Sequence, residues 1–447
     1  MRIKRVLCWM AVSALCLGAC SNAADTGTTD GAAGTPAATT AETAAPETTA
    51  PETTAPETTV PAETPGSVTV TLPVASRENG VITAEEWSEM FPEIYASYMA
   101  NADNSESIDH VKEYPQIAIL YEGMAFNQYY NSARGHVYTL EDIQATGRPH
   151  PLANCLTCKT PDYTALVNAT GVEAYKLEFD EVMAQIDEPV SCYNCHGNEA
   201  NTGKLVVTHQ YLTDAMGSEI GNVDPDVLSC AQCHNEYYFD PETKATTLPY
   251  NGIDAMHPDA ILAYYNEMGF ADYTNPRTGT KMIKVQHPEF ETYMGQDSFL
   301  KTTGETCADC HMGKVESETG VTYSSHEWTS PLQNEALIEN SCKTCHDGVQ
   351  LKETVEFVRE IQEQVEGRTI KIADDLVALT EALAAAVESG DYTEEELDAI
   401  RAVNRDAQFY WDFVFVENSE GAHNSKLSNY CLDQAETLCA EAMGMFK

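Results

Sequence analysis

Positive charge is scarce in this sequence. Its 447 residues include 70 aspartate and glutamate residues but only 25 lysine and arginine residues, so that the net charge is −45. A nucleic-acid partner is not expected, because phosphates are bound mainly by lysine and arginine. Attraction to anionic lipid through surface charge is not expected either. The charge balance instead predicts a well-solvated acidic surface.

Long hydrophobic runs are also missing after residue 20, where no segment reaches eighteen apolar residues. The first 20 residues carry Arg2, Lys4 and Arg5, and then an apolar stretch of about a dozen residues, too short to cross a bilayer. This stretch ends in Leu17–Cys20, which resembles a bacterial lipobox. We predict a lipoprotein signal peptide at 1–20 and an exported chain, lipid-anchored at Cys20 to the outer side of the cytoplasmic membrane. The alternative is an ordinary secretory signal.

The next segment, 21–66, is built almost entirely from Ala, Thr, Pro, Glu, Gly and Asp, and the phrase APETT occurs three times in it. Such a composition cannot bury enough apolar surface to offset the entropy of ordering the chain. We therefore predict a disordered tether at 21–66 and a folded domain at 67–447.

Cysteine gives the folded part its chemistry. Fifteen cysteines are present, and ten of them form five Cys-x-x-Cys pairs. Histidine follows four pairs directly, which is the signature of c-type haem attachment: two thiols add to the haem vinyl groups and the next imidazole binds the iron. The four sites are Cys192, Cys195 and His196; Cys230, Cys233 and His234; Cys307, Cys310 and His311; and Cys342, Cys345 and His346.

The fifth pair is Cys155 and Cys158, followed by Lys159 instead of histidine. Alone, such a pair could be a disulfide or part of a zinc site. Beside four haem motifs it predicts a fifth haem whose proximal ligand is the Lys159 amine, because burial favours the neutral, iron-binding form of lysine. Two other cysteines, Cys431 and Cys439, lie about 12 Å apart along a predicted helix, so we expect free buried thiols there.

Twelve histidines are present, and four of them are the proximal ligands named above. If four of the five haems are six-coordinate, eight histidines remain for four distal positions. The supply of ligands therefore does not by itself reveal an open iron site.

The order of the motifs, with the lysine motif first, resembles the ammonia-forming pentahaem cytochrome c nitrite reductases over about residues 75–430. Three further segments carry the resemblance: Arg134–His136, Glu236–Tyr238 and Lys284–Glu289. The resemblance implies five covalent haem c groups and a haem-packed, mainly α fold.

The resemblance also implies distal ligands: His136 for the haem on Cys230 and Cys233, His326 for the haem on Cys192 and Cys195, and His423 for the haem on Cys307 and Cys310. The haem on Cys342 and Cys345 departs from the family, because 288–306, where the family has its distal histidine, contains no histidine. The candidates left open are Met294, Lys301, His209 and His257.

The resemblance makes the Lys159 haem catalytic, with Tyr237, His287 and an arginine on its distal face. We assign the arginine to Arg148, and Arg134 is the alternative. An anionic substrate requires a cationic pocket in so acidic a protein, and an arginine fork suits an N–O group. The family's calcium site corresponds to Glu236, Tyr237, Lys284 and Gln286, whose oxygens suit a hard cation. The alternative is that the side chain of Arg277 or Lys284 fills this cavity.

After residue 350 the apolar pattern becomes helical. Val355, Val358, Ile361 and Val365 share one face, Ile372, Leu376, Leu379 and Leu383 share another, and a third helix is expected to begin at Thr393 with Glu396 as its capping box. The fold is therefore expected to be mainly α, with long C-terminal helices from about 350. Family members dimerise through such helices, so a homodimer is expected.

These features together predict the six-electron reduction of nitrite to ammonium at the Lys159 haem, with four other haems relaying electrons. A membrane quinol-oxidising cytochrome is the electron donor that the resemblance implies. The alternatives are a reductase of sulfite or hydroxylamine on the same scaffold, and an electron-transfer cytochrome without catalytic activity.

Overall fold

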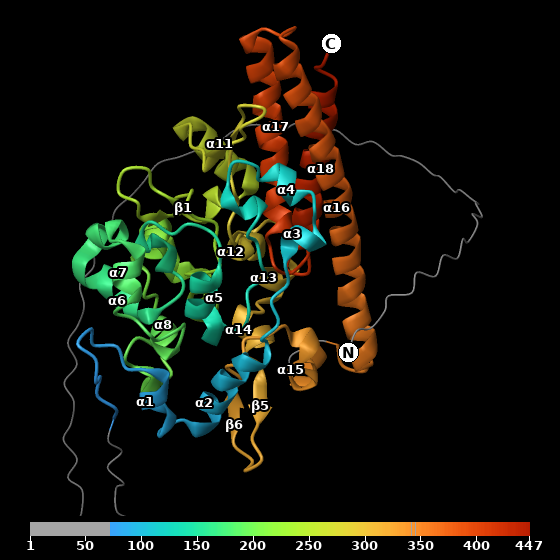
Figure 1. Cartoon of the computed structure of the whole chain (residues 1–447). Coiled ribbons are helices and arrows are strands. Elements are labelled where there is room, and N and C mark those ends of the chain that lie inside the picture. Colours follow the sequence, from blue (N-terminus) through green and yellow to red (C-terminus); the bar gives the residue numbers. More distant parts are fainter. Residues whose placement is uncertain (1–71, 341, 345) are drawn as a thin grey trace, which may run out of the picture. The chain divides into compact units, whose positions relative to one another are not determined.

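The computed structural model of the chain describes residues 72–340, 342–344 and 346–447. The predicted signal peptide (1–20), the whole predicted tether (21–66) and the attachment residue Cys345 lie outside the described residues. Val70–Lys447 form one compact unit, and Figure 1 shows how its elements are arranged.

Three long helices form the C-terminal part of the structure: α16 (Leu351–Ser389), α17 (Glu394–Phe415) and α18 (Ser425–Met443). They pack side by side (Figure 1). The Thr393 hydroxyl accepts a hydrogen bond from the backbone of Glu396, whose carboxylate accepts one from the Thr393 backbone, so the predicted capping box begins α17. α16 ends at Gly390, which takes the left-handed conformation with φ 70°.

Two apolar stripes that the sequence suggested as separate helices belong to one helix of 39 residues. The stripes meet at Gly367, and the position of a Cβ there is free of neighbours within 4 Å. A single glycine costs a helix only about 1 kcal/mol relative to alanine, and α16 recovers this by packing on α17 and α18.

The other helices are short and are joined by loops: α1 (Ala84–Ser88), α2 (Pro92–Met99), α3 (His110–Glu113), α4 (Ile117–Leu120), α5 (Thr139–Ala145), α6 (Pro161–Thr170), α7 (Phe179–Met183), α8 (Cys192–His196), α9 (Gln210–Met216), α10 (Pro225–Ala231), α11 (Pro258–Met268), α12 (Glu289–Met294), α13 (Phe299–Thr303), α14 (Cys307–His311) and α15 (Glu335–Asn340). Among the described residues, strands form three small antiparallel pairs: β1 (Tyr238–Phe239) with β2 (Thr246–Thr247), β3 (Tyr273–Thr274) with β4 (Lys281–Met282), and β5 (Lys314–Glu316) with β6 (Thr322–Ser324). The expected mainly α class is confirmed.

The largest apolar cluster joins the long helices to the loops of the haem-motif region. Trp411 and Phe409 of α17 are buried in it together with Tyr121, which follows α4, and Tyr265 of α11. Cys431 and Cys439 are buried on α18 as free thiols, as expected. Within the described ranges, no helix combines the length and the apolar character that a bilayer crossing requires.

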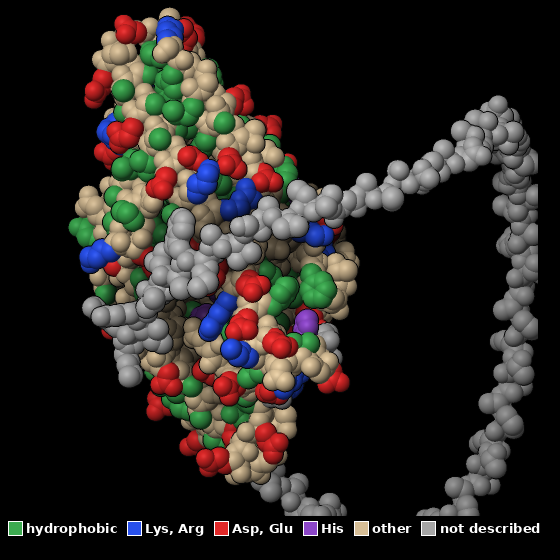
Figure 2. Space-filling view, turned by 90° about the vertical axis from the view of Figure 1, so that its right-hand side faces the viewer, with side chains coloured by type: hydrophobic (Ala, Val, Ile, Leu, Met, Phe, Trp, Pro, Cys, Tyr) green, Lys and Arg blue, Asp and Glu red, His purple; other side chains and the backbone are tan. Residues whose placement is uncertain are grey.

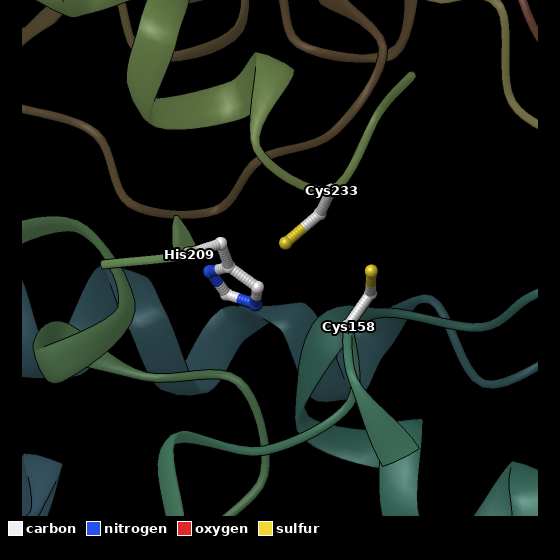
Figure 3. A group of neighbouring side chains, drawn as sticks. All are labelled: Cys158, His209 and Cys233. Atoms are coloured by element: carbon white, nitrogen blue, oxygen red, sulfur yellow. The ribbon is translucent and has the colours of Figure 1, made fainter. Parts of the chain in front are cut away.

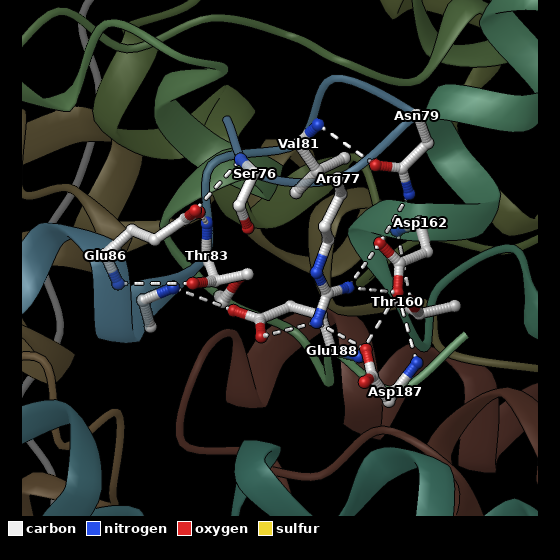
Figure 4. A network of polar contacts seen from close by, with 12 residues as sticks. Ser76, Arg77, Asn79, Val81, Thr83, Glu86, Thr160, Asp162, Asp187 and Glu188 are labelled. Carbon is white, nitrogen blue, oxygen red and sulfur yellow. Dashed lines mark hydrogen bonds and ion pairs between the residues drawn. The ribbon is translucent and has the colours of Figure 1, made fainter. Parts of the chain in front are cut away.

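A polar network fixes the start of the folded chain to α6 (Figure 4). The Arg77 guanidinium donates to both oxygens of Asp162, at 2.9 and 2.8 Å, and Asn79 donates to the same carboxylate at 2.7 Å. The side chain of Asp162 is almost completely buried. Because α6 begins two residues after Lys159, this network supports the segment that carries the lysine motif.

Candidate haem sites and active site

Short helical turns present the haem-attachment motifs. α8 consists of Cys192–His196 and α14 of Cys307–His311, and each begins directly after a capping residue, Ser191 or Thr306. On a helix, residues i and i+4 lie on one face. The first cysteine and the histidine of each motif therefore point to the same side, as attachment to one haem requires.

Three pairs of facing histidines each join a motif histidine to a predicted distal ligand, and a further contact joins His234 to His287, whose ring centres are also 6.1 Å apart. The ring centres are 6.1 Å apart for His136 and His234, 6.5 Å for His196 and His326, and 6.2 Å for His311 and His423. A metal–imidazole nitrogen bond is about 2 Å long, so an ion between two such rings separates their centres by about 6 Å. The chain therefore places these pairs at a spacing that fits an iron between them.

The remaining ring nitrogens have hydrogen-bond partners that fix the ring orientation. Nδ1 lies 2.9 Å from a backbone carbonyl oxygen in His196, His311 and His326. In His423 the partner is the carboxylate of Glu417, at 2.6 Å. An Nδ1–H bond of this kind leaves Nε2 free to bind a metal.

Lys159 lies between the 3-10 turn Ala153–Leu156 and the first turn of α6, which Thr160 caps. Its backbone carbonyl accepts a hydrogen bond from the Thr139 hydroxyl at 2.7 Å, which ties the motif to α5. The Lys159 charge also contributes to lowering the pKa of His287. The lysine and the predicted distal histidine are therefore close enough in space to interact.

The predicted distal residues share one electrostatic environment. Burial, followed by the charges of Lys159 and Lys284, lowers the pKa of His287 to about 3, so its ring is neutral near pH 7. Burial raises the pKa of Tyr237 well above its usual range, while the charge of Arg148 acts in the opposite direction. Nδ1 of His287 is buried without a hydrogen-bond partner in the described structure.

Of the two candidate arginines, Arg148 belongs to this pocket. Its guanidinium lies 4.3 Å from the ring centre of Phe126 and donates to the Tyr129 carbonyl at 3.0 Å. Arg134 instead binds Asp142, at 2.6 Å, and Glu141 of α5. The Arg134 side chain is thus held on the surface of a helix.

The predicted calcium residues converge behind the pocket. Glu236 is fully buried; it accepts hydrogen bonds from the Tyr265 hydroxyl at 2.9 Å and from the backbone N–H of Gln286 at 2.6 Å. Burial raises the pKa of Glu236 well above its usual range. The Gln286 amide lies 2.8 Å from the Lys284 carbonyl oxygen. A desolvated carboxylate beside carbonyl and amide oxygens is a donor set that fits Ca²⁺.

The two basic side chains considered for this cavity have other hydrogen-bond partners, although the charge of Glu236 still acts on the pKa of Lys284. Arg277 binds Glu122 at 2.6 Å and Glu381 at 2.9 Å, where all three side chains are partly exposed. The Lys284 amine donates to the Val285 carbonyl at 2.6 Å and lies 3.3 Å from Asp412. The amine also lies over the aromatic rings around it, the nearest centre being 4.9 Å away.

Sequence reasoning missed several groups around these sites. Tyr130 and Phe126 line the region of Arg148 and Lys284, and Asp412 on α17 binds both Lys284 and the Tyr121 hydroxyl. Their sequence neighbourhoods carry no motif, so only the fold could bring them to the site.

Cys158, His209 and Cys233 form a compact group, with their ligand atoms all within 4.8 Å of one another (Figure 3). Two of the three are haem-attachment cysteines, and both ring nitrogens of His209 have partners, Gln232 at 3.1 Å and the Thr157 carbonyl at 2.9 Å. We therefore interpret this group as the meeting point of two haem motifs rather than as a separate metal site.

These motif turns, facing histidine pairs and short helices define a multihaem c-type cytochrome. The chain belongs to the cytochrome c552 family, whose model matches residues 83–446.

Among solved structures, the fold is similar to the cytochrome c nitrite reductase of Desulfovibrio desulfuricans, described for the two calcium sites of its catalytic subunit. The TM-score is 0.72 at 27% identity, over 81% of this chain and 85% of that chain. A more distant likeness is to an undecahaem cytochrome from the S-layer of Carboxydothermus ferrireducens, with a TM-score of 0.36 at 18% identity, over 70% of this chain and 41% of that chain.

Proposed function

We propose that this cytochrome reduces nitrite to ammonium at a haem attached to Cys155 and Cys158 and ligated by Lys159. The observation that carries the proposal is that these predicted residues lie within electrostatic reach of one another, Lys159 with His287 and Arg148 with Tyr237. The likeness to a nitrite reductase over most of both chains supports it. Nitrogen changes from +3 to −3 in this reaction, so six electrons must reach one site.

The pocket residues have separable roles in this proposal. Arg148 supplies the positive charge that attracts an anion into a protein of net charge −45, because the Lys159 amine is neutral when it binds iron and Lys284 is paired with Asp412. The neutral ring of His287 donates a hydrogen bond, and it relays a proton by accepting one from solvent at one ring nitrogen as it releases one from the other. The Tyr237 hydroxyl, whose raised pKa keeps it protonated, is a second donor.

When bound, haem supplies the iron that holds the substrate and the redox centres that store electrons. The chain determines how these centres are ordered. The sulfurs of Cys158 and Cys233 lie within 4.8 Å of each other, and the Cys307 thiol is close enough to Cys230 to lower the pKa of that thiol. The charge of Cys342 acts on Cys310. We infer a relay in which the Lys159 haem adjoins the His234 haem, followed by the His311 and His346 haems.

We further propose a calcium ion bound by the Glu236 carboxylate, the carbonyls of Tyr237 and Lys284 and the amide of Gln286. Calcium is named for the D. desulfuricans enzyme, and the buried carboxylate described above supports a cation here. Such an ion would stabilise the segment between Lys284 and His287, and so the position of the distal histidine.

The cellular setting is also proposed. A lipid anchor at Cys20 and a membrane quinol-oxidising electron donor follow from the sequence resemblance alone. A homodimer through the long helices is supported by Phe357 of α16, which is 60% exposed. Figure 2 views the side that carries α16, and hydrophobic side chains are exposed there among charged ones.

The decisive experiment is an ammonium assay with nitrite and a strong reductant, combined with spectroscopy of the oxidised protein. We expect ammonium as product and one high-spin haem that responds to added cyanide or nitrite, because a substrate site requires an open iron position. A fully low-spin spectrum that ignores added ligand would instead assign the chain to electron transfer. Turnover of sulfite or hydroxylamine in place of nitrite would change the proposed substrate but not the site.

A further inference from the structure

All twelve histidines of the chain lie in its described residues, so each can be placed. Six form the three facing pairs, and His287 belongs to the catalytic pocket. His346 is the proximal residue of the last motif. The four that remain are His110, His150, His209 and His257, and one of them would have to face His346 to complete a bis-imidazole haem there.

Distances along helix α16 show how far two of these four histidines lie from His346. His346 lies in a tight turn just before the helix, since the Val349 N–H donates to its carbonyl at 3.0 Å. His110 packs against Tyr114, whose hydroxyl binds Glu366. Glu366 lies 15 residues along α16 from Leu351, about 22 Å at 1.5 Å per residue. His110 is therefore far from the turn that holds His346.

His257 is equally distant. Its ring lies 5.3 Å from that of Tyr430 on α18, and the preceding residue, Asn429, accepts a hydrogen bond from Arg368 at 2.6 Å. Arg368 is 17 residues along α16 from Leu351, about 25 Å by the same rise. His257 also caps α11, where its side chain accepts the Asp259 N–H.

The other two histidines belong to the surroundings of the lysine motif. Both ring nitrogens of His209 have hydrogen-bond partners beside Cys158, as described above. His150 stacks on Phe179 at 4.9 Å between ring centres, and Phe179 packs with Leu156 and Tyr163 in the apolar cluster around that motif. Neither ring faces the last motif.

We infer that the haem attached to Cys342 and Cys345 has no second imidazole ligand, so that its sixth position is held by another group. The inference rests on the haem sites proposed above. Of the two other side chains considered from the sequence, Met294 is buried in the main apolar cluster. Lys301 is exposed on α13, and its amine donates to the Met294 carbonyl at 3.0 Å. Of these two side chains, we test the Lys301 amine, which must leave the Met294 carbonyl to bind iron.

The test is to count haem classes in the purified five-haem protein by electron paramagnetic resonance and near-infrared magnetic circular dichroism. We expect three bis-imidazole haems, the Lys159 haem, and one haem of a different ligand class. Four bis-imidazole haems would overturn the inference. Ammonium formation is measured separately, because it depends on the Lys159 haem. Absence of that activity would contradict the proposed function but would not change the count of haem classes.

The variant Lys301→Ala tests the identity of the ligand. If the amine binds the iron, the spectrum of this one haem shifts to that of an open or water-bound site, while haem content and the three bis-imidazole signals stay the same. Lys352→Ala is the matched control, because Lys352 is exposed on α16 and paired with Glu356. An unchanged spectrum in Lys301→Ala would exclude the amine and leave the Met294 thioether or an exogenous molecule at this position.

Discussion

At the scale of single residues, the hydrogen-bond partner of the Nδ1 atom distinguishes one haem site from the others. His196, His311 and His326 meet backbone carbonyls, whereas His423 meets the buried carboxylate of Glu417. Glu417 also accepts the Ser419 hydroxyl at 2.6 Å. A carboxylate makes an imidazole a stronger electron donor than a carbonyl does, and ligand donation lowers the potential of an iron centre.

We therefore expect Glu417→Gln to raise the midpoint potential of the haem ligated by His311 and His423, because the amide keeps an acceptor but removes the negative charge. Spectroelectrochemical titration should resolve one shifted haem among five. Ser419→Ala leaves the carboxylate in place and should shift that potential less. An unchanged titration curve in Glu417→Gln would contradict a tuning role for this residue.

A second prediction at this scale concerns His287. His287→Ala should lower nitrite turnover by about 10²–10⁴-fold, the usual contribution of a positioned proton donor, while five haems remain attached. Steady-state ammonium formation and the low-spin spectra check the two parts. His150→Ala is a useful control near the same pocket. Loss of a low-spin signal in His287→Ala would instead identify His287 as an iron ligand.

At the scale of elements, the network around Asp162 connects the N-terminal segment to α6 and so to the lysine motif. The carboxylate also accepts backbone N–H groups from Asp187 and Glu188, both at 3.2 Å. Because one buried side chain joins three segments, its removal should loosen all of them. Lys159 lies next to the affected helix and should be sensitive to this change.

Asp162→Ala should accordingly destabilise the protein by roughly 3 kcal/mol, since it removes the buried acceptor of the Arg77 guanidinium, the Asn79 amide and two backbone N–H groups, and leaves Arg77 only Asp187 and Glu188. Denaturant unfolding of the haem-loaded protein measures this, and the high-spin signal of the Lys159 haem should change with it. Glu173→Ala breaks only the exposed pair with Lys176 and should cost less than about 1 kcal/mol. Equal stability of the two variants would show that the network has no structural role.

Elements with local signals could be predicted from the sequence. The capping box at Thr393 and the start of the long helices near residue 350 follow from neighbouring residues and are confirmed. The continuity of α16 through Gly367 could not be predicted, because packing on α17 and α18 decides it. Asp412 was missed for the same reason, because its partners Lys284 and Tyr121 are distant in the sequence. Glu417 lies only six residues before His423, but it belongs to no recognised motif.

At the scale of the whole molecule, the five attachment motifs form a connected series rather than separate sites. Neighbouring sulfurs belong to different motifs, as for Cys158 with Cys233 and Cys230 with Cys307. The motifs were visible in the sequence, because their spacing is local. Their order in space, and the absence of a histidine facing His346, emerged only from the fold.

The mass of the purified protein tests this arrangement. We expect the mass to exceed that of the polypeptide by five haems after denaturation, because every Cys-x-x-Cys pair is followed by a residue that can bind iron. A gain of four haems would place doubt on the lysine motif and on the catalytic proposal with it. The double variant Cys155→Ala/Cys158→Ala, which cannot attach the fifth haem, provides the reference mass for a protein with four haems.

The closeness of Cys158 to Cys233 also bears on how the protein matures. Free thiols this near each other in an oxidising compartment are prone to form a disulfide, and such a bond would block two attachment sites at once. Haem must therefore be joined to the chain while its thiols are still apart and reduced. We therefore expect covalent haem attachment to precede folding, so that the polypeptide folds around haem groups that are already attached.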